Sequence, residues 1–173
     1  MSAVRQSSIA LCFLASHVAA QISAGFVTLG PHPNEPQSRL KGAIRVQAIE
    51  GTDLLHVTGI ISGLQDGVQL GQAASWDIRE GFSCESDPGR KFRDVVGSPW
   101  NTECSVPIKS NTPCFTVTDA TGVATIDSTI QGFSLTDANA VLGRAVVIRQ
   151  TDGRAIGCGL IEPARGELVT FGR

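Results

Sequence analysis

Residues 40–48 read LKGAIRVQA, a stretch in which apolar and polar side chains alternate. Such a period of two is typical of a half-buried β-strand. The face predicted to be buried carries Leu40, Gly42, Ile44, Val46 and Ala48. Turn residues follow at 50–52 and a second strand-like stretch runs over 54–62, so the two stretches predict a β-hairpin.

Further strand-like stretches continue in both directions from this hairpin. They cover residues 26–30, 75–80, 115–119, 122–127, 144–150 and 156–161. Turn chemistry at 119–122 predicts another hairpin, and the 19 glycines and 8 prolines agree with many short strands. No convincing amphipathic helix interrupts them, so we expect an all-β sandwich or barrel. The irregular stretch 81–113 is too long for a passive connector, and we expect a functional or disulfide-pinned loop there.

Length and composition are those of one globular domain. The chain has 173 residues, 42% of them hydrophobic, and a formal net charge of -2. A core of ordinary size is therefore available without a metal or a partner. The near-neutral charge argues against a nucleic-acid-binding surface, because such surfaces are strongly basic.

The first twenty residues differ from the rest and predict a signal peptide. Arg5 precedes the apolar stretch 9–15, and small residues at 18–20 would allow cleavage before Gln21. The apolar stretch is too short to span a bilayer, and no second membrane segment follows. An organellar presequence is the alternative. We expect a secreted, extracellular protein with one domain over residues 21–173.

Cysteine usage agrees with secretion. Cys12 would leave with the signal, and the four remaining cysteines are Cys84, Cys104, Cys114 and Cys158. An even number predicts disulfides, although spacing leaves all three pairings open. Zinc binding is the rival interpretation, but the chain has no Cys-x-x-Cys pair and few histidines.

Three segments resemble the copper/zinc superoxide dismutase superfamily. They are HVTGIISGLQDG at 56–67, FTVTDATGVATIDSTIQGFSL at 115–135 and GRAVVIRQTDGRAIGCGLIEP at 143–163. The resemblance extends from about residue 24 to residue 163 and implies an eight-stranded Greek-key β-sandwich, or flattened barrel. It also implies a disulfide between Cys84 and Cys158, which leaves Cys104 with Cys114.

The same resemblance locates the copper-ligand positions, and none of them is histidine here. The family's His-x-His pair falls on Asp77 and Arg79, the bridging histidine falls near Lys91, and the fourth falls on Arg149. Arginine stays protonated at biological pH and cannot bind a metal. The zinc cluster has no counterpart either, because no histidine follows His56. We therefore expect no catalytic residues, no bound metal and no cofactor.

The remaining candidate site residues have simpler interpretations. We expect His56 to be a solvent-facing or hydrogen-bonded strand residue, and His32, between two prolines, to lie in an exposed turn. The acids Glu80, Glu85 and Asp87 could bind a hard cation, and the cations Arg90, Lys91 and Arg93 could bind an anion, but a solvated loop explains both sets. Arg154 is one residue away from the family's anion-guiding arginine, whose aligned place holds Ala155. Trp76 and Trp100 could belong to a core or to an interface.

These observations predict a superoxide dismutase-like pseudoenzyme. It would be a secreted, disulfide-bonded domain without a metal site, acting as a non-catalytic binding or structural module. The alternatives are a divergent superoxide dismutase or copper-binding protein involved in superoxide metabolism, and a subunit of an extracellular assembly. The partner would be an unknown protein or a second copy, not nucleic acid. We also expect Asp77 to bridge the cations of the former copper site by charge-assisted hydrogen bonds.

Overall fold

The computed structural model describes residues 22–64, 73–85, 114–116, 121–137, 140–150 and 152–164. Within these residues the regular structure is all-β, as predicted. The strands are β1 (Ala24–Pro31), β2 (Lys41–Ala48), β3 (Leu54–Ser62), β4 (Ala73–Ile78), β5 (Cys114–Thr116), β6 (Ala124–Gln131), β7 (Ala145–Arg149) and β8 (Ala155–Pro163). The predicted signal segment 1–20 lies outside the described residues. No helix among the described residues has the length and apolar character needed to cross a membrane.

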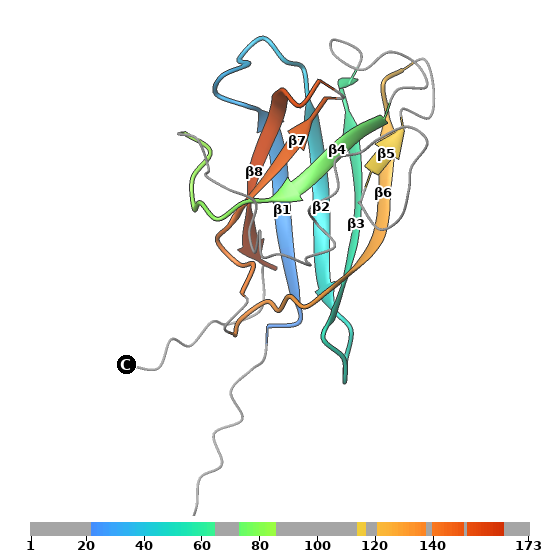
Figure 1. Cartoon of the computed structure of the whole chain (residues 1–173), viewed down its shortest axis with the longest axis vertical. Helices are drawn as coiled ribbons and strands as arrows, with labels where there is room; N and C mark the ends of the chain where they lie inside the picture. Colours follow the sequence, from blue (N-terminus) through green and yellow to red (C-terminus); the bar gives the residue numbers. More distant parts are fainter. Residues whose placement is uncertain are drawn as a thin grey trace, which may run out of the picture.

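The strands form one antiparallel sheet that curls back over itself. Their order is β5-β4-β7-β8-β1-β2-β3-β6. β4 and β7 are drawn across β1, β2 and β3 in Figure 1, with β8 beside them. The sheet therefore encloses a core between its two halves.

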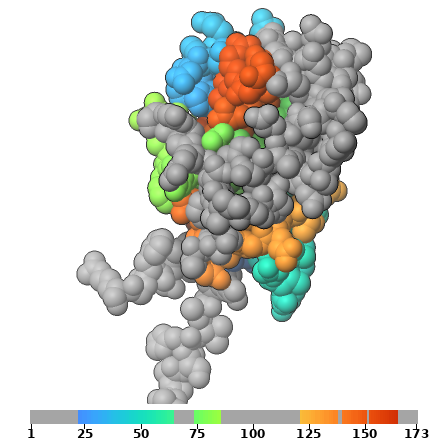
Figure 2. Space-filling model, in the orientation of Figure 1, coloured from blue at the N-terminus to red at the C-terminus, as the bar shows by residue number. Residues whose placement is uncertain are grey.

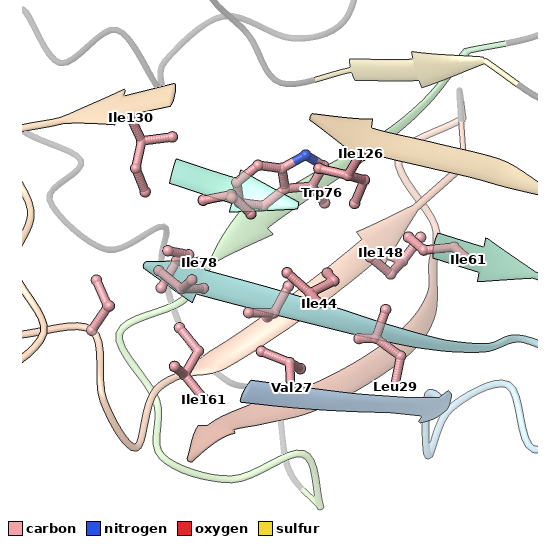
Figure 3. Close-up of a cluster of buried hydrophobic side chains, with 14 of the residues drawn as sticks. Val27, Leu29, Ile44, Ile61, Trp76, Ile78, Ile126, Ile130, Ile148 and Ile161 are labelled. Carbon is pink, nitrogen blue, oxygen red and sulfur yellow. The ribbon is translucent and has the colours of Figure 1, made fainter. Parts of the chain in front are cut away.

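That core is built from alternate residues of both halves. Val27, Ile44 and Ile61 come from one half, and Trp76 and Ile148 come from the other; all five are buried in a single cluster. Figure 3 shows these side chains together in the space between the strands. The sequence left the place of Trp76 open, and the structure assigns it to the core.

The hairpin predicted from residues 40–62 is present. β2 and β3 pair in antiparallel register, with Ile44 opposite Gly59. Leu40, Ile44 and Val46 are buried as predicted, whereas Ala48 is exposed because it lies at the end of the strand.

The limits of several strands differ from the sequence prediction; β4, for example, spans Ala73–Ile78 rather than 75–80. β6 begins at Ala124 rather than at Gly122, because Gly122 has a positive φ of 71° and its carbonyl accepts a hydrogen bond from Leu64 N. The strand then continues to Gln131, past the predicted end, with its burial still alternating. β5 is Cys114–Thr116, and residues 117–120, which belong to the predicted strand 115–119 and the predicted turn 119–122, lie outside the described residues.

Strand β7 is buried on both faces. Val146 and Ile148 enter the large core, while Ala145 and Val147 form a smaller apolar cluster with Cys158 on the opposite face. We call this opposite face of β4, β7 and β8 the second face. It carries Asp77, Arg79 and Arg149, which the family resemblance assigned to copper-ligand positions.

Candidate functional site

Asp77 projects onto the second face because of its place on β4. Its neighbours Trp76 and Ile78 point into the large core, so the alternation of a strand sends the Asp77 side chain the other way. Asp77 is opposite Val147 on β7, and Arg149 is opposite Ser75 one pleat further along. The register therefore places Arg149 diagonally beside Asp77.

The predicted contact between Asp77 and both arginines is present. Arg79 Nη2 donates a hydrogen bond of 3.0 Å to Asp77 Oδ2, and Arg79 Nε lies 2.5 Å from Oδ1. This second contact is an ion pair without a hydrogen bond. Arg149 Nε donates to Asp77 Oδ2 at 3.3 Å, and its Nη1 donates to Gly153 O at 2.7 Å.

This ionic cluster, Asp77 with Arg79 and Arg149, combines one carboxylate with two guanidinium groups. Asp77 and Arg79 are buried, with side-chain exposures of 9% and 11%, and Arg149 is partly buried. The formal charge of the cluster is therefore +1. A buried carboxylate needs such charge-assisted contacts, because losing hydration is costly for an ion.

A disulfide shares the second face with the ionic cluster. The structure joins Cys84 to Cys158, two cysteines that are 74 positions apart, and this is the pairing that the family resemblance implied. Cys158 is opposite Val147, which is opposite Asp77 on its other side. One row across β4, β7 and β8 thus runs from the carboxylate through a buried valine to the disulfide.

The segment between the cluster and the disulfide is held by backbone contacts. Arg79 N donates to Ala145 O at 2.7 Å, and Ala145 N donates to Gly81 O at 2.9 Å. Arg144 donates to Glu80 O at 2.8 Å, and its guanidinium lies 4.8 Å from the centre of the Phe82 ring. Burial lowers the pKa of Arg144, and the nearby Glu80 carboxylate partly opposes that shift.

A cavity of about 280 Å³ lies beside Arg149, between the turn after β1 and the turn before β8. Arg154 and Glu35 line it and form an ion pair of 2.9 Å across the two turns. Hydrogen bonding to Glu35, together with that carboxylate's charge, raises the pKa of Arg154. The expectation of an exposed His32 is wrong: it is 3% exposed, lines the cavity, and its Nδ1 accepts a hydrogen bond from Asn34 N.

Some of the other residues singled out in the sequence are described by the structure, and the rest lie outside the described residues. His56 is a hydrogen-bonded strand residue, with Nε2 2.8 Å from Asp127 Oδ1. Among the residues that the structure describes, no group of three or more histidine, cysteine or acidic residues could hold a metal ion, Glu80 and Glu85 included. Outside the described residues lie Asp87, Arg90, Lys91, Arg93, Trp100 and Cys104, and of Cys114 only the backbone is described.

Sequence reasoning missed Glu35 altogether. It lies in the proline-containing stretch after β1, 119 positions before its partner Arg154, and no local pattern singles it out. Only the pairing of β1 with β8 brings the two turns to the same end of the sheet.

The described side chains of Asp77, Arg79 and Arg149, which the resemblance assigned to copper-ligand positions, do not fit a copper ion. Copper sites use neutral imidazoles, which offer a lone pair. Arg79 and Arg149 have no lone pair to offer, and the Asp77 oxygens already contact both guanidinium groups. A divalent cation brought there would meet two fixed positive charges.

Comparison with known proteins identifies the fold alone. No protein-family model matches the sequence, and no curated protein matches it. Solved structures do match, among them the crystal structure of the clock protein EA4, with a TM-score of 0.57 and 18% sequence identity over 82% of this chain and 95% of that chain. At this identity the similarity supports a shared all-β architecture and carries no function.

Proposed function

We propose that the chain is a superoxide dismutase-like Greek-key sandwich that is secreted and acts as a non-catalytic binding or structural module. The sequence segments at 56–67, 115–135 and 143–163 support the family assignment. The strand order supports the topology, because β3 neighbours β6 and β4 neighbours β7, so connections cross between the two halves as in a Greek key. The Cys84–Cys158 disulfide supports an oxidising, extracellular location.

The single observation that carries the non-catalytic proposal is the ionic cluster. Dismutation of superoxide needs a redox metal, and the residue positions assigned to copper ligands hold a carboxylate already engaged by two arginines. Placing Cu²⁺ about 4 Å from one guanidinium costs about 8 kcal/mol at an effective dielectric of 20. One carboxylate offsets only part of the repulsion from two such groups. Function belongs to a site rather than to a fold, and this site has changed its chemistry.

The test is to measure metal content and dismutation on the same purified protein. We expect no stoichiometric copper or zinc by elemental analysis after dialysis against a chelator. We also expect no dismutation above that of free metal in the buffer. Stoichiometric copper that survives the chelator, with dismutation that disappears when the copper is removed, would instead establish a divergent copper enzyme.

A variant that introduces imidazole ligands makes the assay sharper. The variant Asp77→His with Arg79→His and Arg149→His supplies imidazoles at three of the four assigned positions. If the family assignment is right, this variant should gain measurable copper affinity while the wild type gains none. Failure of both proteins to bind copper would count against the assigned positions, but not against the absence of dismutation in the wild type.

A further inference from the structure

The solvent-facing side of β2, β3 and β6 carries an ordered charge pattern. The register places Arg45, Thr58 and Asp127 in one row across the three strands. The neighbouring row holds Ala43, Ile60 and Thr125. Ile60 on the middle strand is 59% exposed, which is high for a large aliphatic side chain. We call this surface, defined by those six residues, the open face.

Both charges on the open face have bonding capacity to spare. Arg45 is exposed and makes no ion pair within the described part of the chain. The Asp127 side chain is 75% exposed, and His56 contacts only its Oδ1. A cation on β2 and a carboxylate oxygen on β6 therefore flank Thr58, in the row next to that of Ile60, and each is available to an outside group.

We propose that the open face binds the open face of a second copy of this chain. The two-fold axis would run parallel to the strands, above β3. Rotation about such an axis exchanges the positions of β2 and β6 and leaves each row at its own height. Arg45 then lies over the partner's Asp127, because the register puts both residues in one row. Ile60 packs on the partner's Ile60 at the centre.

Other arrangements match the pattern less well. A two-fold axis perpendicular to the strands at the row of Ile60 would place Arg45 over the partner's Lys41, one cation over another. An acidic foreign protein would match Arg45 but repel Asp127, and a basic one would do the reverse. Only a surface with both signs in the opposite order satisfies both residues, and a second copy supplies it.

The small contact area between two open faces predicts a weak and reversible dimer. The whole outer side of the three strands that carry the open face, with eight or nine residues each, a spacing of about 4.8 Å and a rise of about 3.3 Å per residue, offers at most about 400 Å² on each copy. The total of about 800 Å² lies below the usual range for stable complexes. Association should therefore appear only at high protein concentration and should weaken with added salt.

Charge exchange tests the arrangement. Sedimentation equilibrium from about 5 to about 500 μM protein should show a monomer–dimer equilibrium for the wild type. Arg45→Asp alone and Asp127→Arg alone should each weaken association at least about tenfold, since like charges then face each other. The double variant R45D/D127R should restore association to within about threefold of the wild type.

Ile60→Glu should also abolish the dimer, because it places two carboxylates at the two-fold axis. Phe82→Glu is the matched control: Phe82 is 64% exposed and lies outside the open face, so this variant should associate like the wild type. Circular dichroism would verify that each variant is folded. A wild type that stays monomeric at the highest concentration, a higher oligomer, an Ile60→Glu variant that still dimerises, or a double variant that is not rescued would each overturn the proposal.

Discussion

Asp77 is the one anion of a three-residue cluster, and this position makes it the most sensitive member. Its two oxygens contact Arg79, which directly follows β4, and Arg149, which ends β7. The carboxylate thus ties β4 to β7 by charge as well as by the backbone ladder. Taking away either arginine leaves a neutral pair, whereas taking away the carboxylate leaves two cations facing each other.

Removing only this carboxylate should therefore destabilise the fold strongly. We expect Asp77→Asn to lower the free energy of unfolding by about 3–5 kcal/mol, the range seen when one partner of a buried ion pair is lost. The triple variant D77L/R79M/R149M should stay within about 1 kcal/mol of the wild type, because apolar replacements of a whole buried cluster are often neutral. Denaturant unfolding followed by circular dichroism measures both values.

An exposed ion pair in the same protein provides the control. Asp127→Asn removes the negative charge that faces His56 at the surface and should cost less than about 1 kcal/mol. If the triple variant proved less stable than Asp77→Asn, the cluster would contribute favourable energy of its own, contrary to this explanation.

Alanine variants at two glycines with nearly equal φ distinguish the energetic cost of backbone strain from that of steric overlap. Gly51 and Gly63 have φ of 74° and 76°, but only at Gly63 would an added Cβ overlap a neighbour, the backbone carbonyl of Arg39. Gly51→Ala should cost about 1–2 kcal/mol from the left-handed conformation alone. Gly63→Ala should cost about 3–5 kcal/mol because overpacking adds to that strain. Thermal unfolding of the two variants compares them directly, and equal losses would contradict the overlap.

At the residue scale, the sequence predicted the features that follow from strand alternation and from the alignment implied by the family resemblance. Asp77 and Arg79 could be placed on one face because they are two apart, and the resemblance brought Arg149 to them. His32 was misplaced because two flanking prolines are typical of an exposed turn. Its burial depends on a long-range contact, the hydrogen bond from its own backbone to Ile156 O, which no local pattern contains.

Among the elements, the segment from Arg79 to Cys84 is held in place mainly at its two ends. The ionic cluster holds one end and the disulfide holds the other, with backbone bonds to Ala145 between them. Neither end belongs to the large core. The segment should therefore open as a unit at lower free energy than the strands of that core.

Breaking the disulfide should loosen this segment before the sheet unfolds. The double variant C84S/C158A should lose about 4 kcal/mol, the chain-entropy value for a crosslink between residues 74 apart. Hydrogen exchange should rise first at the amides of Arg79 and Ala145, while β2 and β3 stay protected. Equal acceleration in all strands would show that the crosslink supports the whole sheet instead.

The same experiment can be extended to the cysteines outside the described residues. Non-reducing peptide mapping of native protein should join Cys104 to Cys114 and leave no free thiol after Gln21. Finding Cys84 and Cys158 reduced in native material would overturn the extracellular assignment.

Strand existence was more predictable than strand limits. A strand was predicted at residues 40–48, where apolar and polar positions alternate without interruption, and β2 spans Lys41–Ala48. β6 was placed two residues early and ended four residues early, since Gly122 looks like a strand residue until its carbonyl is seen bonded to Leu64. The burial of β7 on both faces could not be predicted from alternation either. Ala145–Ile148 is apolar throughout, so it shows no alternation of apolar and polar residues.

For the whole molecule, stability should not depend on copper or zinc, because the Asp77 carboxylate is already engaged by Arg79 and Arg149. A ligand that binds only the native state raises the unfolding temperature as its concentration exceeds its dissociation constant. We therefore expect the same unfolding midpoint with excess Cu²⁺, with excess Zn²⁺ and with a chelator, as measured by differential scanning fluorimetry. A rise of several degrees with either metal, reversed by the chelator, would reveal a site in the native protein.

The neighbouring positions of β1 and β8 have a mechanical consequence. These strands are antiparallel, with Gly25 opposite Pro163, and Ala164 N donates to Ala24 O at 3.0 Å. Tension applied through the beginning of β1 and the end of β8 would therefore act across adjacent points and load one ladder bond at a time. Such loading peels strands apart at low force, in contrast to shear, in which all the bonds resist together. A domain tethered by these two points would yield early under pulling and serve as a compliant connector rather than a rigid one.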